Sequence, residues 1–312
     1  MAEFENFDVL FASDRSFAYG EQTITQILKS RRAAHNELLI DKLLKTLGVA
    51  RPQDLYPPRS NQSLRNLHSQ IIESASPDHH KQSLLYYILK DTQDHHTTSS
   101  NFARAAFLPQ KYRVFIDGIW LLDRGDFENA LGYLTEPVLI PTFPEEILYL
   151  LCTHPNQQDD KLPLAYYYTV SPAVTSPRVT EAFFAKLAMN SVTEALSWSR
   201  QYDEPRHRKL FEQLIHLVLG GPEGENRARG SVELIHLPFS KEEEAWFEAY
   251  LTDGEGKHLH GAKDAYKVRT VATGKCNAIA GRSDAYGDKS DHLMEWSSLG
   301  SSYEQGSMTS AR

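Results

Sequence analysis

The chain has 312 residues, enough for one large domain or two of ordinary size. Its hydrophobic fraction of 41% lies near the low end for folded proteins and still permits a sizeable core. The net charge of −8 argues against a general affinity for nucleic acid or for anionic membranes, because both attract an excess of basic side chains. This net charge does not exclude a local basic patch.

The two cysteines, Cys152 and Cys276, lie far apart in sequence and form no disulfide framework, which fits a reducing cytosol or nucleus. The first ten residues are acidic and lack the basic start of a signal peptide. No apolar run approaches the ~20 residues that a membrane-spanning helix needs. These features predict a soluble intracellular protein without membrane insertion.

Helical periodicity dominates the chain from its first third onward. Four apolar residues recur at i, i+3, i+4 and i+7, and Gly48 follows them where a left-handed residue would end the helix: Ile40, Leu43, Leu44 and Leu47. Prolines then separate many segments of helical length. Helices of 10 to 15 residues with short loops predict an all-α fold, an irregular α-solenoid of stacked helical pairs.

The segment Val114–Leu122 is apolar almost all the way round, which predicts a helix buried on most sides at the centre of the array. Gly125 is expected to end this helix at positive φ, and Asp126 to cap the next one. Four residues share one face of that second helix: Phe127, Ala130, Leu131 and Leu134. The small Ala130 is expected to let the two backbones approach closely.

A weaker copy of this pair follows, with matching residues at Val192, Ala195, Leu196 and Ser199. Beyond it, Gly220–Gly230 is expected to be a surface loop, and Ser231–Ile235 is the one run with a hint of strand alternation. From about Gly281 the chain is rich in Ser, Gly and Asp. The sequence therefore predicts a helical domain over residues 1–280 and a polar, mostly disordered tail over residues 281–312.

The strongest metal signal is a histidine-rich region with residues Asp78, His79, His80, Asp91, Asp94, His95 and His96. HD-type phosphohydrolases hold a metal with His and Asp on helices, but here no His is followed directly by Asp. We favour polar segments flanking the apolar helix Leu84–Leu89, because metal ligands must converge with defined geometry. Cys152 lacks zinc-ligand spacing and is expected to be a small buried residue.

Other catalytic signatures are weak. Gly254–His258 lacks the spacing and the Ser or Thr of a phosphate-binding loop, and no Gly-x-Ser-x-Gly sequence occurs. Glu242–Glu244 follows Ser240 and suits the first turn of a helix, where negative charge is favoured. We therefore expect no enzyme activity, no cofactor and no small-molecule substrate.

Two aromatic groups are candidates for partner binding. Tyr166, Tyr167 and Tyr168 are consecutive, so they cannot all face one core, since each residue turns a helix by about 100°. Trp246, Phe247 and Tyr250 form a second aromatic face and are the predicted partner-binding residues, because exposed aromatics are enriched at binding hot spots. The alternative for both groups is packing between helices.

The run Phe102–Leu151 carries a specific pattern. Its members are Phe102-Ala103, Leu108-Pro109, Tyr112, Gly118, Trp120, Leu122-Asp123, Gly125, Phe127, Ala130-Leu131, Tyr133-Leu134 and Pro137. This pattern resembles the ELYS-type domain of nuclear pore assembly proteins. Flanking pieces agree: Leu43-Leu44 to Pro57-Pro58, Lys81–Asp91 and Pro238–Leu251. The resemblance covers roughly residues 20–280, and Cys276 with the residues after it departs from the pattern.

The resemblance implies a structural nucleoporin in the nucleus, at the nuclear envelope, that docks on the Y-shaped outer-ring complex of the nuclear pore. Larger animal relatives add a β-propeller and a chromatin-binding tail with an AT-hook; this chain resembles the short fungal form. Chromatin binding therefore cannot be carried over to it from those relatives. Two alternatives remain: a helical adaptor of another intracellular assembly, and, more remotely, a metal-dependent hydrolase of helical fold built on the histidine-rich region.

Overall fold

A computed structural model of the chain describes residues 3–11, 19–92, 95–157 and 159–274. These residues form seventeen α-helices and two short 3-10 helices with no β-strand among them, which confirms the predicted all-α class. The elements, in chain order, are η1 (Glu3–Glu5), α1 (Phe7–Phe11), α2 (Glu21–Ala33), α3 (Leu39–Thr46), α4 (Pro52–Leu55), α5 (Asn61–Glu73), α6 (Asp78–Lys90), α7 (His95–Ala105), α8 (Gln110–Arg124), α9 (Phe127–Leu134), α10 (Pro144–Thr153), α11 (Lys161–Val170), α12 (Pro177–Asn190), α13 (Val192–Ser199), α14 (Glu204–Gly220), α15 (Glu225–His236), α16 (Lys241–Thr252), η2 (Glu255–His258) and α17 (Ala262–Ala272).

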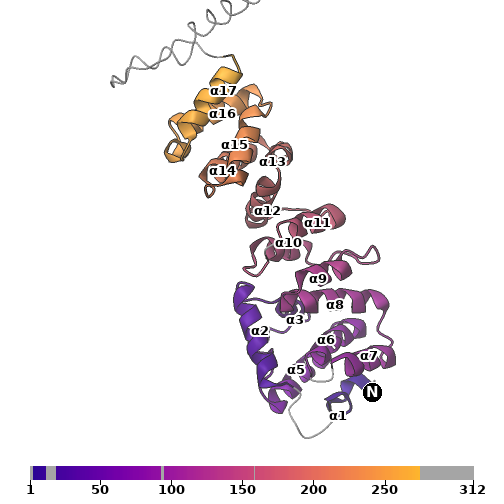
Figure 1. Ribbon diagram of the computed structural model, residues 1–312. Helices are drawn as coiled ribbons and strands as arrows, with labels where there is room; N and C mark the ends of the chain where they lie inside the picture. Colours follow the sequence, from indigo (N-terminus) through magenta and orange to yellow (C-terminus); the bar gives the residue numbers. More distant parts are fainter. Residues whose placement is uncertain (1–2, 12–18, 93–94, 158, 275–312) are drawn as a thin grey trace, which may run out of the picture.

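The helices form an elongated stack that follows the order of the chain (Figure 1). Helices up to α9 make a broad N-terminal half, α10 to α13 form a narrower middle, and α14 to α17 form the opposite end (Figure 1). From α6 onward nearly every helix packs against the next one or the next but one in the chain. This local pattern confirms the solenoid of stacked pairs. None of the described helices combines the length and apolarity needed to cross a membrane.

Helix α8 lies at the centre of the N-terminal half rather than of the whole array, and it packs against α2, α3, α6 and α9. Ile116, Ile119 and Leu122 are buried on it. The close approach to α9 depends on Gly118, since a Cβ there would lie 2.6 Å from Leu134 Cγ. Ala130 is fully buried, but Gly118 is the residue whose missing side chain makes the approach possible.

Glycines end helices where the sequence predicts. Gly48 follows α3 at φ 94° and Gly125 follows α8 at φ 81°. The capping role predicted for Asp126 is wrong: its side chain caps no backbone N–H and accepts two hydrogen bonds from the Asn129 amide instead. The neighbouring amide competes for the carboxylate that the first turn of α9 would otherwise use.

The surface loop expected over Gly220–Gly230 is shorter in the structure, and the hint of a strand at Ser231–Ile235 is wrong. Helix α14 continues through Gly220, and α15 already starts at Glu225, so the connection is only four residues long. Gly230 lies inside α15, where a Cβ would lie 3.4 Å from Val218 Cγ1. Leu234 and Ile235 are buried on the same helix. Packing against α14 therefore overrides the weak local preferences of this segment.

The predicted tail, residues 281–312, lies outside the described residues, as does Cys276.

Phe107 is a large apolar side chain in an unusual backbone conformation. It follows α7 at φ 50°, and its side chain is 89% exposed. The Leu108 N–H reaches back over it to the Ala103 carbonyl, 2.9 Å away, in the manner of a helix end that glycine usually occupies.

We therefore expect Phe107→Gly to raise the free energy of unfolding by about 0.5–1 kcal/mol. Relief of ~1–2 kcal/mol of left-handed strain outweighs the extra ~0.5–1 kcal/mol of backbone entropy that glycine loses on folding. Chemical denaturation measures the change. The control is Ala106→Gly, at a residue without positive φ, which should destabilise the protein. Equal destabilisation by both substitutions would contradict the strain at Phe107.

Candidate interaction surfaces

Two buried carboxylates organise the N-terminal half. The first, Asp91 at the end of α6, is 1% exposed and accepts hydrogen bonds from four side chains of distant segments. The Tyr56 hydroxyl lies 2.6 Å and the Trp120 Nε1 2.8 Å from its oxygens; Tyr19 and Arg124 complete the set. The Arg124 guanidinium also lies 4.7 Å from the Trp120 ring centroid. Asp91 thus ties α6 and α8 to the chain before α2 and after α4.

The second carboxylate, Asp123 on α8, holds the start of α3. It accepts the Leu39 N–H at 2.8 Å and the Ile40 N–H at 3.0 Å, and the Tyr87 hydroxyl at 2.9 Å. Residue 38 before α3 is a leucine, which has no side-chain oxygen to cap the helix. Asp123 therefore replaces the missing local cap from across the fold. Burial raises the pKa of Asp123 to about 7, partly offset by these three hydrogen bonds.

The raised pKa of Asp123 predicts a pH dependence of stability. Between about pH 4 and pH 7 the Asp123 carboxyl is protonated in a larger fraction of folded chains than of unfolded chains. The contribution of Asp123 to the free energy of unfolding must therefore fall as the pH rises through this window and level off above it. We expect the stability of the wild type relative to Asp123→Asn to be greatest at the acid end. Denaturation of both proteins from pH 4.5 to 8 measures this difference in stability. The contributions of other titrating groups cancel because both proteins contain them. A stability difference that does not change with pH would refute the prediction.

The described residues of the histidine-rich region contribute to the packing of the helices. Asp78, His79 and His80 form the first turn of α6, where the His79 ring lies 4.8 Å from the Tyr112 ring centroid. Asp91 faces its four donors. Asp94 and the side chains of His95 and His96 lie outside the described residues. Within the described part, no group of three or more His, Cys, Asp or Glu side chains is placed to hold a metal ion. Cys152 is partly buried near the end of α10, and burial raises the pKa of its thiol.

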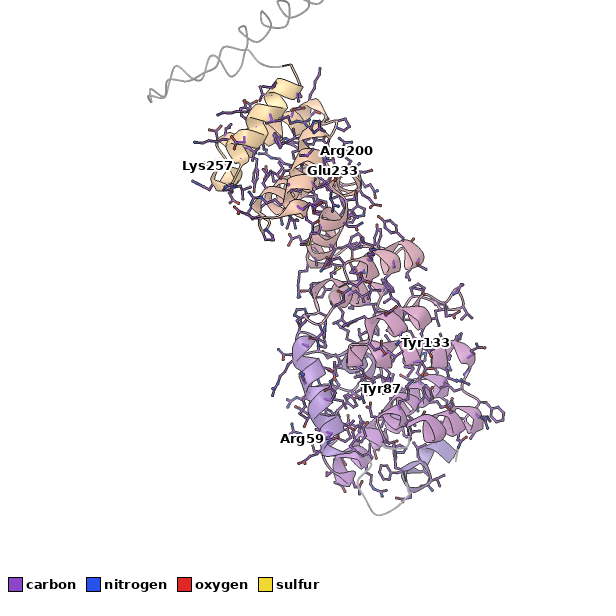
Figure 2. All side chains as sticks on the ribbon, viewed as in Figure 1. Arg59, Tyr87, Tyr133, Arg200, Glu233 and Lys257 are labelled. Carbon is purple, nitrogen blue, oxygen red and sulfur yellow. The ribbon has the colours of Figure 1, made fainter. Side chains whose placement is uncertain are left out.

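The acidic turn of α16 does more than favour the helix dipole. Glu243 is 1% exposed; it accepts the Ser240 N–H at 2.7 Å and pairs with Arg200 of the α13 end at 2.7 Å. Glu244 pairs with Arg269 of α17, also at 2.7 Å. The Ser240 hydroxyl in turn accepts the Glu243 N–H, completing a capping box. These ion pairs connect α16 to the helices on both sides, and Arg200 lies within the C-terminal part of the stack (Figure 2).

Of the three aromatic residues predicted to bind a partner, two lie in the core and one is half-buried. Phe247 is 1% and Tyr250 8% exposed, so both rings belong to the hydrophobic core, as the packing alternative holds. Trp246 is half-buried, with its ring centroid 5.3 Å from that of His207 on α14. Of the three predicted residues, only Trp246 presents appreciable surface to a partner. The helical period explains the division, since Phe247, Tyr250 and the buried Leu251 face the core.

The three tyrosines of α11 point in different directions, as predicted. Tyr166 is buried, Tyr167 stacks on Phe183 at 4.3 Å between centroids, and Tyr168 is 53% exposed. The Tyr168 hydroxyl donates to Glu194 at 2.6 Å. Packing between helices therefore accounts for Tyr166 and Tyr167, and Tyr168 is tied to α13.

An apolar groove that periodicity does not predict lies between α3, α6 and α8, and we call it the α3–α6–α8 groove. Its volume is about 460 Å³. The loop before α10 forms one rim, where Ile140 is 78% exposed. Fourteen residues from four segments line it: Leu43, Thr46, Leu47, His80, Ser83, Leu84, Lys111, Tyr112, Phe115, Ile116, Leu139, Ile140, Thr142 and Phe143. Because these segments are distant in sequence, only the folded structure brings them together.

Comparisons with known proteins identify the family of this chain. The family model named ELYS, described as nuclear pore complex assembly, matches residues 37–254, which run from α3 through α16. A Schizosaccharomyces pombe protein named ely5 is 30% identical over 245 residues, which are 77% of this chain and 78% of that protein. Protein ELYS of Xenopus laevis is 27% identical over 238 residues; this match spans 69% of this chain and only 9% of the Xenopus protein. The chain belongs to the ELYS family of nuclear pore complex assembly proteins.

Proposed function

We propose that this chain is a structural nucleoporin that docks on the Y-shaped outer-ring complex of the nuclear pore and works through binding surfaces, without catalysis. The family match over residues 37–254 carries the proposal. The structure supports it in kind: an elongated helical stack offers long surfaces to partners, as solenoids do. The buried carboxylates Asp91 and Asp123 have partners that stabilise the fold.

The test is purification of the full, tagged chain from its native cells under mild salt, with identification and quantification of the co-purifying proteins. The proposal predicts outer-ring nucleoporins in amounts close to that of the chain. Recovery of the subunits of a different assembly, such as a coat or a proteasome-lid-like complex, would favour the adaptor alternative and reject the outer-ring partner.

Trp246 remains a proposed contact residue, and Trp246→Ala tests it. The ring is half-buried against His207, so we expect the protein to stay folded and to lose part of its signal at the nuclear rim. A hot-spot aromatic contributes ~2 kcal/mol or more to binding. Live imaging of the tagged variant measures the rim signal, and circular dichroism checks the fold. Met189→Ala, at an exposed apolar side chain of α12, is the control. Unchanged rim intensity in the folded Trp246 variant would place the contact elsewhere.

A further inference from the structure

We infer that the α3–α6–α8 groove binds an amphipathic helix of a partner protein that carries acidic side chains beside its apolar face. This inference deepens the proposed function, because it names the docking surface and the chemistry of what it receives. It rests on that function only for the partner's identity, an outer-ring nucleoporin.

The groove offers apolar surface that nothing in the described chain covers. Its floor is built from core residues, among them Leu47, Leu84 and Ile116, which are 9% exposed or less. Tyr112 and Phe115 of α8 stand half-buried along it. Ile140 is 78% exposed and the neighbouring Val138 57% exposed. Covering such side chains removes apolar area from water, which is the main favourable term in association.

The rim is fixed in place before any partner arrives. Phe143 has φ 54°, a costly conformation for a bulky residue, and it precedes α10 with its carbonyl accepting the Ile147 N–H at 3.0 Å. The Leu139 N–H donates to the Glu136 carbonyl at 3.0 Å, which closes a turn on the other side of Ile140. A preorganised rim lowers the entropy lost on binding.

The charges of the groove favour a partner with acidic side chains. The chain as a whole carries a net charge of −8, yet no carboxylate lines the groove. Its two basic residues are His80 and Lys111, and the Lys111 amine lies 5.1 Å from the Tyr112 ring centroid. Among the described residues, no carboxylate forms an ion pair with Lys111. An acidic side chain beside the apolar face of the bound segment would supply the missing partner.

A helix suits this shape better than an extended strand. The described part of the chain has no β-strand whose edge could pair with an added strand. The groove runs between helices, and its apolar residues come from four segments. An amphipathic helix meets such a groove with anchors at i, i+3 or i+4, and i+7.

The test places a photo-crosslinking amino acid at position 140 of the full chain in its native cells and identifies the cross-linked peptide by mass spectrometry. Two surface substitutions, Ile140→Ser and Lys111→Glu, are then compared for retention of that partner. The matched controls are Val232→Ser, at an equally apolar exposed site, and Lys257→Glu, which lies at the opposite end of the stack (Figure 2). Each groove substitution should reduce retention about tenfold, equivalent to ~1.4 kcal/mol, and the controls by less than about twofold.

The expected cross-linked peptide has apolar residues at helical spacing and at least one Asp or Glu beside them. If it comes from an outer-ring nucleoporin, the groove and the proposed function both stand. If a peptide of this pattern comes from a protein outside the outer ring, the groove stands and the proposed function falls. A second copy of this chain, a basic segment, no cross-link, or full retention by both groove variants would overturn the inference.

Discussion

Replacing Asp91 by alanine is expected to cost several kcal/mol of folding free energy and to lower the melting temperature of the protein. The carboxylate is fully buried and accepts from Tyr19, Tyr56, Trp120 and Arg124. Alanine would leave these donors without this acceptor in a buried site. Breaking a buried ion pair by removing one partner typically costs ~3–5 kcal/mol, a large part of the ~5–15 kcal/mol that stabilises a domain.

Thermal and urea denaturation of purified protein measure this effect. Asp253→Ala, which removes a carboxylate from the exposed end of α16, should stay within ~0.5 kcal/mol of the wild type. A melting temperature for Asp91→Ala as high as that of this control would show that the Asp91 network adds nothing to the fold.

The second large effect is expected at Arg269. Only 4% of this residue is exposed, although it carries a charge. Its guanidinium donates to the carbonyls of Ile235 and Leu237 at the end of α15 and to Glu244 of α16, and it lies 3.6 Å from the Phe239 ring centroid. Arg269→Ala removes the group that joins α15, α16 and α17, and we expect a loss of ~3–5 kcal/mol.

Two further variants separate charge from geometry. Lys267→Ala removes an exposed cation from the same helix and should have little effect. Arg269→Lys keeps the charge but cannot form the planar fork of hydrogen bonds, so it should recover only part of the loss. Urea denaturation, followed by circular dichroism, compares the three. Full recovery by lysine would mean that charge alone matters at this site.

Local sequence signals predicted the features of the fold that depend on neighbouring residues. Gly48 and Gly125 end helices because both positions need positive φ, and the buried face of α13 repeats that of α9. The hint of a strand at Ser231–Ile235 was wrong because the structure of this segment depends on residues far away in the sequence. Its residues form a helix because Leu234 and Ile235 pack in the core of the array, which a short window does not reveal.

The buried networks could not have been predicted from spacing alone. Asp123 caps a helix more than eighty positions earlier in the chain, and Arg269 reaches carbonyls more than thirty positions away. No periodicity links such residues. The family pattern did contain Trp120 and Asp123, but only the structure shows that both are there to hold helices together. The same limit applies to the α3–α6–α8 groove, whose lining comes from four separate segments.

Membership of the ELYS family puts the chain in the nucleus, at the nuclear envelope, within the nuclear pore complex. A stable helical stack with buried carboxylates at its core and apolar surface left open in the α3–α6–α8 groove fits a structural subunit of such an assembly. Its physical task is then to hold the binding surfaces in fixed positions along the stack.

Rapid depletion of a single outer-ring subunit, followed by imaging of the tagged chain at the nuclear rim, tests the proposed docking most directly. We predict that the rim signal of the chain falls with the signal of the outer ring, while a nucleoporin anchored independently in the same pores stays in place. A rim signal that persists after the outer ring has gone would contradict docking on the Y-shaped complex.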